Sequence, residues 1–198
     1  MLSGMTSDVR KFWDAQAASF DEEPDHGLLD PEVRAAWDEV LLPAMPPAPA
    51  RVVDLGCGTG SVTLLLAQAG HDVDGVDLSD RMVAAARTKV GPSARVRRGD
   101  AADPPFEPAS VDVVFARHVL WALPDPDAAV ARWVRLLRPG GRLVLVEGLW
   151  STGSGISAAR CRDLVGRHRE EVVVRRLDDP RLWGGPISDE RYLLTSPN

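Results

Sequence analysis

Hydrophobic and polar positions follow two alternating patterns along most of this chain. From residue 51 onward, short runs rich in β-branched residues are followed by stretches whose apolar residues recur every three or four positions. Strands that alternate with helices in this way are typical of a parallel sheet covered by helices on both faces. The runs expected to form successive strands cover residues 51–55, 71–77, 94–100, 111–117 and 142–147.

Helix signals separate these strands. Residues 61–69 and 80–90 have helical spacing, and each segment is followed by a glycine, which favours a helix end. Asp125 or Asp127 can cap a further helix, which ends before Pro139. Ahead of the sheet, Pro31 stands at the first position of another predicted helix. Its apolar face, suited to docking on the sheet, is formed by Val33, Trp37, Val40 and Leu41.

The C-terminal part follows a different order. Residues 157–169 predict a helix, and residues 170–177 and 189–196 predict strands. The loop between these two strands is too short for a helical crossover, so we expect them to be antiparallel neighbours. The whole pattern predicts an α/β fold of the Rossmann-like, doubly wound type. Its sheet should have seven strands, mostly parallel, with an antiparallel last strand and helices on both faces.

The length of 198 residues suits a single domain. Within it we expect residues 1–45 to form a helical cap over the active site, residues 50–148 the ligand-binding core, and residues 149–198 the last helix and strand pair. The net charge of -6 disfavours nucleic acid as a partner. No apolar run approaches the about 20 residues that cross a bilayer, and the N-terminus lacks the apolar segment of a signal peptide. These features predict a cytoplasmic protein with no membrane partner.

The two cysteines, Cys57 and Cys161, are far apart and lack the spacing of a zinc site, so we expect reduced thiols and no metal. The strongest candidate for a ligand-binding loop is instead the stretch VVDLGCGTGSVTLL at residues 52–65. A dinucleotide-binding loop has the pattern G-x-G-x-x-G, whose third glycine would fall at Ser61. Here the glycines alternate, and they follow an acid. These glycines are Gly56, Gly58 and Gly60, and the acid is Asp54.

Acids also end other predicted strands. Asp54, Asp77, Asp100 and Glu147 follow the first, second, third and fifth strands. In an open parallel sheet, ligands bind beyond the carboxyl ends of the strands, where four carboxylates would repel a pyrophosphate. Asp77 is placed to accept both hydroxyls of a ribose. The pattern therefore favours a nucleoside ligand that carries an ammonium group and no phosphate, as S-adenosylmethionine does.

Several motifs in order strengthen this interpretation. VVDLGCGTG, GVDLSDRMV, RGDAADPPF, and LLRPGG followed by RLVLVEG resemble class I S-adenosylmethionine-dependent methyltransferases. They are similar to the small-molecule type 11 group that includes ubiquinone and menaquinone methyltransferases. The resemblance covers residues 50–148, and FWDAQAASFDEEPDHG is similar to the N-terminal cap of many such bacterial enzymes. It implies a methyltransferase that uses S-adenosyl-L-methionine and releases S-adenosyl-L-homocysteine.

The resemblance also implies roles for individual residues. The three glycines would let the methionine part of the cofactor approach, with Asp54 near its amino group and Arg117 facing the same end. Asp77 would bind the ribose, and Asp100 and the Ala101 amide would bind the adenine. The remaining residues expected around the cofactor are Leu78, Met82, Trp13 and Phe20.

The positions of histidine, arginine and tryptophan residues in the sequence, without the family resemblance, suggest groups that bind the methyl acceptor. His118, just beyond the fourth strand, and His26, in the cap, are candidate general bases. His71 and His168 are expected on the surface. Arg117 or Arg160 can pair with a substrate carboxylate. Of the tryptophans, Trp37 and Trp133 are expected in the core, Trp13, Trp121 and Trp150 around the acceptor, and Trp183 in a loop.

These observations predict transfer of a methyl group in line to an oxygen, nitrogen or carbon atom of a small metabolite, mainly through proximity and orientation. A general base is needed only for an acceptor that arrives protonated. One alternative is a non-catalytic protein that binds S-adenosylmethionine. Another is an NAD-dependent oxidoreductase, with which Ser61 and Asp54 conflict. Methylation of RNA or protein is disfavoured by the acidity. We expect a monomer or a homodimer.

Overall fold

A computed structural model describes residues 2–197 and contains one seven-stranded sheet in the order β3-β2-β1-β4-β5-β7-β6. Strand β7 pairs antiparallel with β5 and β6, whereas β1 to β5 pair in parallel. The predicted fold class is therefore confirmed. The strands are β1 (Arg51–Leu55), β2 (Asp72–Asp77), β3 (Arg95–Arg98), β4 (Val111–Arg117), β5 (Leu137–Leu149), β6 (Val173–Arg176) and β7 (Glu190–Ser196).

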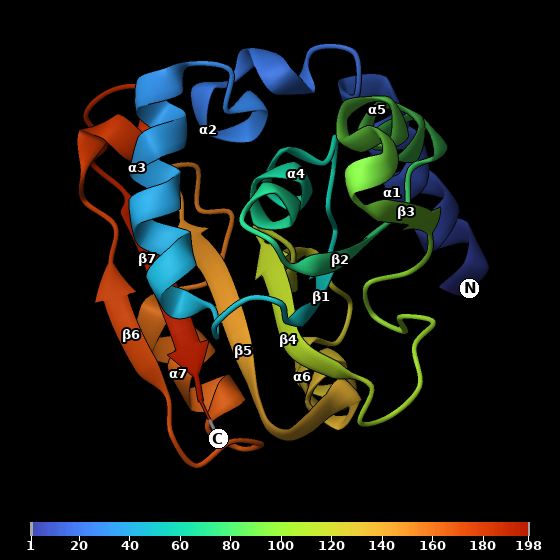
Figure 1. The fold of residues 1–198 in the computed structure, drawn as a ribbon, viewed down its shortest axis with the longest axis vertical. Helices are drawn as coiled ribbons and strands as arrows, with labels where there is room; N and C mark the ends of the chain where they lie inside the picture. The colour runs from blue at the N-terminus through green and yellow to red at the C-terminus, as the bar shows by residue number, and fades with distance from the viewer. Residues whose placement is uncertain (1, 198) are drawn as a thin grey trace.

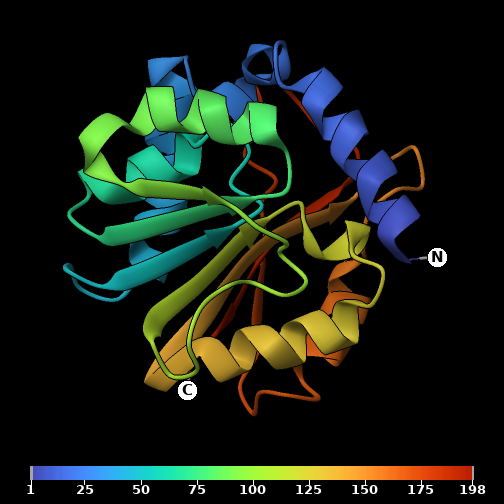
Figure 2. The same ribbon diagram turned by 90° about the vertical axis from the view of Figure 1, so that its right-hand side faces the viewer.

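Helices cover both faces of this sheet and cross its upper edge (Figure 1). A quarter turn of the molecule shows two layers of helices with the sheet between them (Figure 2). The α-helices are α1 (Leu2–Gln16), α2 (Pro24–Gly27), α3 (Pro31–Leu41), α4 (Ser61–Gln68), α5 (Asp80–Val90), α6 (Pro126–Leu136) and α7 (Ala158–Val165). Within the described residues, no helix has the length and apolar character needed to cross a bilayer.

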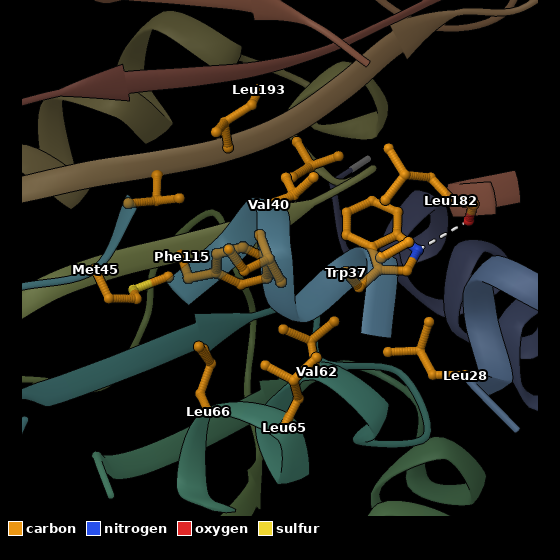
Figure 3. Packing of buried hydrophobic residues seen from close by; sticks show 14 of the residues in the cluster. Leu28, Trp37, Val40, Met45, Val62, Leu65, Leu66, Phe115, Leu182 and Leu193 are labelled. Atoms are coloured by element: carbon orange, nitrogen blue, oxygen red, sulfur yellow. Dashed lines mark hydrogen bonds between the residues drawn. The ribbon is translucent and has the colours of Figure 1, made fainter. Parts of the chain in front are cut away.

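Two apolar cores hold the layers together, one on each face of the sheet. On one face, side chains of α3 and α4 pack against inward-facing residues of β4 and β5, as Figure 3 shows for Trp37, Leu65 and Phe115. The indole Nε1 of Trp37 donates a hydrogen bond to the Leu182 carbonyl, 2.9 Å away. On the other face, Trp133 of α6 is fully buried against β4 and β5. Both indoles lie in the core, as expected.

The helix α3 corrects the expected extent of the cap over residues 1–45. Its residues Val33 and Trp37 are buried, because its apolar face docks on the sheet instead of on the strand ends. Only the segment from α1 to α2 crosses the edge where the strands end (Figure 1). Residues 1 and 198 lie outside the described part of the chain, so the expected limits of the domain are described only between residues 2 and 197.

Several element boundaries differ from the predictions for local reasons. Strand β3 ends at Arg98, because the Asp100 carboxylate accepts a hydrogen bond from the Ala102 amide and turns the chain. The Asp125 carboxylate caps α6 by accepting from the Ala128 amide, which settles the choice between the two aspartates. His71 precedes β2 at the expected edge but is only 7% exposed, so the prediction of a surface group is wrong.

Candidate active site

A cavity of about 550 Å³ opens at the carboxyl ends of β1 and β4. The strand order reverses between these two neighbours, which is the place where open α/β sheets bind ligands. The volume lies within the roughly 300–1,000 Å³ typical of small-molecule sites. All the predicted site residues line this cavity except Gly60.

The loop after β1 brings backbone to one end of the cavity. Gly56 has φ of 72°, and a Cβ atom there would lie 2.3 Å from Cγ2 of Val119. Gly58 lies under the ring of Phe20, whose Cε1 atom would be 3.1 Å from an added Cβ. Glycine at these positions leaves a backbone cradle that a side chain would fill.

Gly60 has a different position from the other two glycines. It is the N-cap residue of α4, and a Cβ atom there would lie 3.0 Å from Cβ of Ala86 on α5. It is absent from the cavity wall. Its small size therefore serves the close packing of α4 on α5, and its role beside the cofactor stays a prediction.

Asp54 ends the buried part of β1 and is 2% exposed. Burial raises the pKa of its carboxyl to about 6, although the hydroxyl of Thr63 donates a hydrogen bond of 2.6 Å to Oδ2 and favours the ionised form. With this pKa, the Asp54 carboxyl is ionised in most molecules at pH 7. It is suited to binding an ammonium group at the glycine loop.

Asp77 lies at the end of β2, beside the same loop. Its Oδ2 atom accepts the Gly58 amide and its Oδ1 atom accepts the Ser79 amide, both at 2.9 Å. Burial raises the pKa of this carboxyl, and the amides partly oppose the shift. Each carboxylate oxygen keeps a further lone pair for a ligand hydroxyl. Asp77 thus shapes the glycine loop and can bind a diol.

Four more predicted residues complete this end of the cavity. Leu78 and Met82 supply apolar surface, and Met82 is 1% exposed. Asp100 and Ala101 line the wall beyond β3. The Ala101 carbonyl is already used, since it accepts the indole Nε1 of Trp133 at 2.7 Å. An apolar slot with polar atoms at its rim suits a purine-like ring.

The N-terminal segment closes over this end. Trp13 and Phe20 line the cavity, with ring centroids 6.4 Å apart. Polar contacts fix their segment to the core at two places. The Ser79 hydroxyl donates to Asp14 at 2.6 Å, and the Lys89 ammonium pairs with Asp21 at 2.8 Å. The cap is therefore attached to both ends of α5.

Strand β4 delivers Arg117 and His118 to the middle of the cavity. The Arg117 guanidinium lies over the Trp37 ring at 5.1 Å and donates a hydrogen bond to the Asp25 carbonyl. His118 has φ of 59°, an uncommon conformation for a non-glycine residue that is often found at functional sites. Its amide donates to the Val146 carbonyl at 2.8 Å, which holds this conformation.

Glu147 supports this turn from below instead of lining the cavity. It is fully buried, and its Oε1 atom accepts the amides of Val119 and Leu120 at 3.0 and 2.7 Å. Burial raises the pKa of its carboxyl to about 8. The expectation of four carboxylates around one crevice is wrong for Glu147, because its side chain is directed at backbone amides.

The two candidate bases meet at a residue that the sequence did not single out. Nε2 of His26 and Nε2 of His118 each lie 3.8 Å from Oδ2 of Asp25. Burial lowers the pKa of His118 to about 4 and lowers that of His26 as well, so both imidazoles are neutral at pH 7. His26 also stacks on Phe20, with ring centroids 4.3 Å apart.

Aromatic side chains wall the other end of the cavity. Trp121 and Trp150 line it with centroids 5.5 Å apart, as expected, and Arg191 of β7 joins them. Trp183 lies in the core, 8% exposed, and Arg160 on α7 is exposed and absent from the cavity wall. The proposed substrate pairing of Arg160 is therefore not supported. Arg191 comes from a strand outside every recognisable motif.

The two ends differ in chemistry. The end beside β1 and β2 offers a backbone cradle, two acids and apolar surface, which fit the ammonium, ribose and adenine of S-adenosylmethionine. The end beside β4 and β5 offers aromatic rings, imidazoles and Asp25. Fold and cavity together define a Rossmann-like protein whose one cavity has two chemically different ends.

Comparison with known proteins identifies the family. A family model described as a methyltransferase domain matches residues 53–145. A phosphatidylethanolamine N-methyltransferase of Cereibacter sphaeroides is 32% identical over 142 residues, which cover 67% of this chain and 70% of that protein. A demethylmenaquinone methyltransferase of Clavibacter sepedonicus is 31% identical over 149 residues, covering 74% of this chain and 60% of that protein. The chain belongs to the S-adenosylmethionine-dependent methyltransferase family, as the motifs predicted.

Other relatives are longer, and the chain spans 38% to 42% of the length of several that are 36% to 40% identical. Among solved structures, a chain from the complex containing the Haloferax volcanii Trm112 methyltransferase activator has a TM-score of 0.71, with 23% identity over 93% of this chain and 96% of that one. The [4+2]-cyclase SpnF has a TM-score of 0.70, with 18% identity over 84% of this chain and 81% of that one. These likenesses show the fold.

Proposed function

We propose that this protein transfers a methyl group from S-adenosylmethionine to an oxygen, nitrogen or carbon atom of a small metabolite. The observation that carries the proposal is the single cavity that joins a nucleoside-type end to an aromatic end at Arg117 and His118. We further propose that the protein acts in the cytoplasm, without a nucleic acid or membrane partner, as a monomer or homodimer.

In this proposal, binding and orientation supply most of the catalysis. S-adenosylmethionine supplies an activated methyl group when bound. Asp54 and Asp77 hold the cofactor by its ammonium group and ribose, and Trp13 and Phe20 cover it and exclude water. Trp121 and Trp150 orient the acceptor. Alignment of two reactants can account for about 7–11 kcal/mol of a reaction barrier.

His118 and His26 are the groups in this site that can take a proton from the acceptor. Both are neutral at pH 7, because burial lowers their pKa values, and the neutral imidazole is the form that accepts a proton. The depressed pKa of His118 makes it a weak base. We therefore propose that acceptors with an acidic proton, or with a lone pair already free, react best.

Calorimetric titration with S-adenosylhomocysteine tests the cofactor part of the proposal. The wild type should bind the compound, and Asp77→Asn should weaken binding by about 100-fold, since each hydrogen bond to a charged group contributes about 1.5–3 kcal/mol. Asp72→Asn, at the exposed opposite end of β2, is the matched control and should bind like the wild type. Absence of binding by the wild type would refute the proposal.

Transfer itself is tested by incubating the protein with methyl-labelled S-adenosylmethionine and a panel of small hydroxyl, amine and carbon acceptors. Label in an acceptor supports the proposal, and the labelled atom identifies the reaction. Tight cofactor binding with no transfer to any acceptor would favour the non-catalytic alternative.

A further inference from the structure

We infer that Asp25 of the cap binds the methyl acceptor, by accepting a hydrogen bond from an amino or hydroxyl group attached to a flat ring. The inference rests on the proposed function, because it assigns the second end of the same cavity. It concerns a residue to which the family resemblance assigned no role.

The first observation is that the Asp25 carboxylate lacks a hydrogen-bond donor. The side chain is 13% exposed and lines the cavity, yet the described part of the chain contains no hydrogen bond to either carboxylate oxygen. Buried polar groups in proteins are nearly always hydrogen-bonded. A largely buried carboxylate that faces a cavity and has no protein donor is available to the donor group of a ligand.

The second observation is that the backbone carrying this carboxylate is held beside the cavity. The Asp25 backbone carbonyl accepts a hydrogen bond from the partly buried Arg117 guanidinium. The short helix α2 ends at Gly27, where an added Cβ would lie 2.2 Å from the Asp21 carbonyl oxygen. These two contacts pack the backbone around Asp25 against the rest of the protein.

The third observation concerns the neighbouring charges. The imidazoles of His26 and His118, each 3.8 Å from Oδ2, are too distant for a direct hydrogen bond, so neither supplies the donor that this carboxylate lacks. Burial acts to raise the pKa of Asp25, but His118 and Arg117 lower it overall, so the carboxylate is ionised. Residues 2–197 contain no three His, Cys, Asp or Glu side chains arranged to hold a metal ion.

The walls define the rest of the ligand. Phe20, Trp121 and Trp150 offer ring faces and edges that suit a flat apolar molecule. Arg191 also lines this end, but its guanidinium is paired with Asp189 through bonds of 2.9 and 3.0 Å. With that cation already neutralised, a donor group for Asp25 fits this end better than a carboxylate for Arg191 does.

The reaction balances with these groups alone. For an acceptor X–H held on Asp25, a lone pair on X forms the new X–CH₃ bond, and the electron pair of the broken carbon–sulfur bond stays on sulfur. The X–H proton passes first to the Asp25 carboxylate that holds it and from there to the neutral imidazole of His26, 3.8 Å away. That side chain is 28% exposed, more than His118 at 13%, and can pass the proton to solvent.

Equilibrium dialysis in the presence of saturating S-adenosylhomocysteine tests the inference with three probes: 1-naphthol, 1-naphthylamine and 1-methoxynaphthalene. The wild type should bind one or both donor-bearing probes at least tenfold more tightly than the methoxy compound. The stronger of the two shows whether hydroxyl or amino acceptors fit. Asp25→Asn should lose that preference. Glu22→Gln removes an equal charge from an exposed cap position outside the cavity wall, and should keep it.

Equal binding of all three probes by the wild type, or failure of all three to bind, would overturn the inference. It would also fail if Asp25→Asn kept the wild-type preference. Histidine titration by NMR provides a readout that needs no acceptor: removing the carboxylate charge should lower the pKa of both His26 and His118. Unchanged pKa values would contradict the arrangement. Tight binding of S-adenosylhomocysteine throughout would show that the proposed function survives even if the acceptor assignment does not.

Discussion

The two ends of the cavity are built in different ways. The cofactor end consists of residues that directly follow β1, β2 and β3, together with the backbone of the glycine loop. The acceptor end gathers single residues from the cap, from the turn after β4, from the loop after β5 and from β7. The first end is fixed by strand order, since parallel strands bring their carboxyl ends together. The second depends on how distant segments pack.

This difference shows where specificity can change without loss of the fold. Asp77 organises the glycine loop through backbone amides, so it cannot change without disturbing that loop. Trp121 and Trp150 lie on connecting segments, where substitutions alter a wall of the cavity and leave the sheet intact. Variants that affect one end, both ends or the support beneath them therefore test the comparison.

The largest effect is expected for Gly56→Ala. This substitution makes a residue of the glycine loop clash with Val119, which lies in the turn after β4. The new methyl group would lie 2.3 Å from Val119, at a φ of 72° that L-residues disfavour. We expect the free energy of unfolding to fall by about 3 kcal/mol or more, and binding of S-adenosylhomocysteine to be lost. Gly140→Ala has a similar positive φ of 80° but no neighbour within 4 Å, so urea unfolding should show a loss of only about 1–2 kcal/mol. Equal losses in the two variants would refute the clash.

The next effect concerns Glu147, the support beneath the acceptor end. Its pKa is raised to about 8 in the folded protein, so the folded state binds more protons than the unfolded state between pH 4.5 and 8. Stability from this group is present at low pH and declines as pH rises through that window. Glu147→Gln should therefore gain roughly 2.5 kcal/mol relative to the wild type between pH 5 and pH 7, measured by urea unfolding. Glu107→Gln, at an exposed position, should follow the wild-type pH profile.

A smaller effect is expected for the charge at the cofactor end. Asp54 has a pKa of about 6, so its ionised form is lost as pH falls from 7 to 5. The affinity of the wild type for S-adenosylhomocysteine should fall over this range, because the protonated acid cannot pair with an ammonium group. Asp54→Asn should bind about tenfold more weakly at pH 8 and lack this pH dependence, as calorimetry can show. A strong pH dependence that persists in the variant would assign it to another group.

The smallest effect on cofactor binding is expected for Trp150→Leu. Trp150 packs against His118 and Arg191, at 5.1 and 5.3 Å, and both belong to the acceptor end. The affinity for S-adenosylhomocysteine should change by less than about twofold, while turnover of an identified acceptor should fall about tenfold or more, since an aromatic contact of this kind contributes about 0.5–1.5 kcal/mol beyond its buried area. A large loss of cofactor affinity would show that the ends are not separate.

Much of the fold can be predicted from the sequence, because segments with the hydrophobic pattern of a strand alternate regularly with segments that have the pattern of a helix. The runs around residues 51–55 and 111–117 predict strands that the structure confirms. The boundaries of β3 and β6 were harder to predict. Asp100 ends β3 through a side-chain hydrogen bond, and β6 is an edge strand of only four residues. The pattern of hydrophobic residues indicates neither the end of β3 nor the short length of β6.

The candidate site divides in the same way. Asp54, Asp77 and the glycines stand in contiguous motifs, which made them visible in the sequence. Asp25 stands beside His26 in the cap, but its meeting with His118 spans more than ninety residues and depends on the Arg117 side chain. The packing role of Gly60 was missed for a related reason, since its neighbour Ala86 on α5 is distant in sequence. Local sequence patterns do not predict contacts between residues that are distant in the sequence.

The contacts of the Lys89 ammonium lead to a prediction about the order in which the two ligands bind. It pairs with Asp21 of the cap and also donates hydrogen bonds of 3.0 and 2.7 Å to the hydroxyls of Thr59 and Ser61 around the glycine loop. The cap segment that Lys89 attaches to the glycine loop also carries Asp25 at the other end of the cavity. Because one segment serves both ends, we predict that the donor binds before the acceptor. Initial-rate measurements should then show ordered addition, with the acceptor binding only to the donor complex.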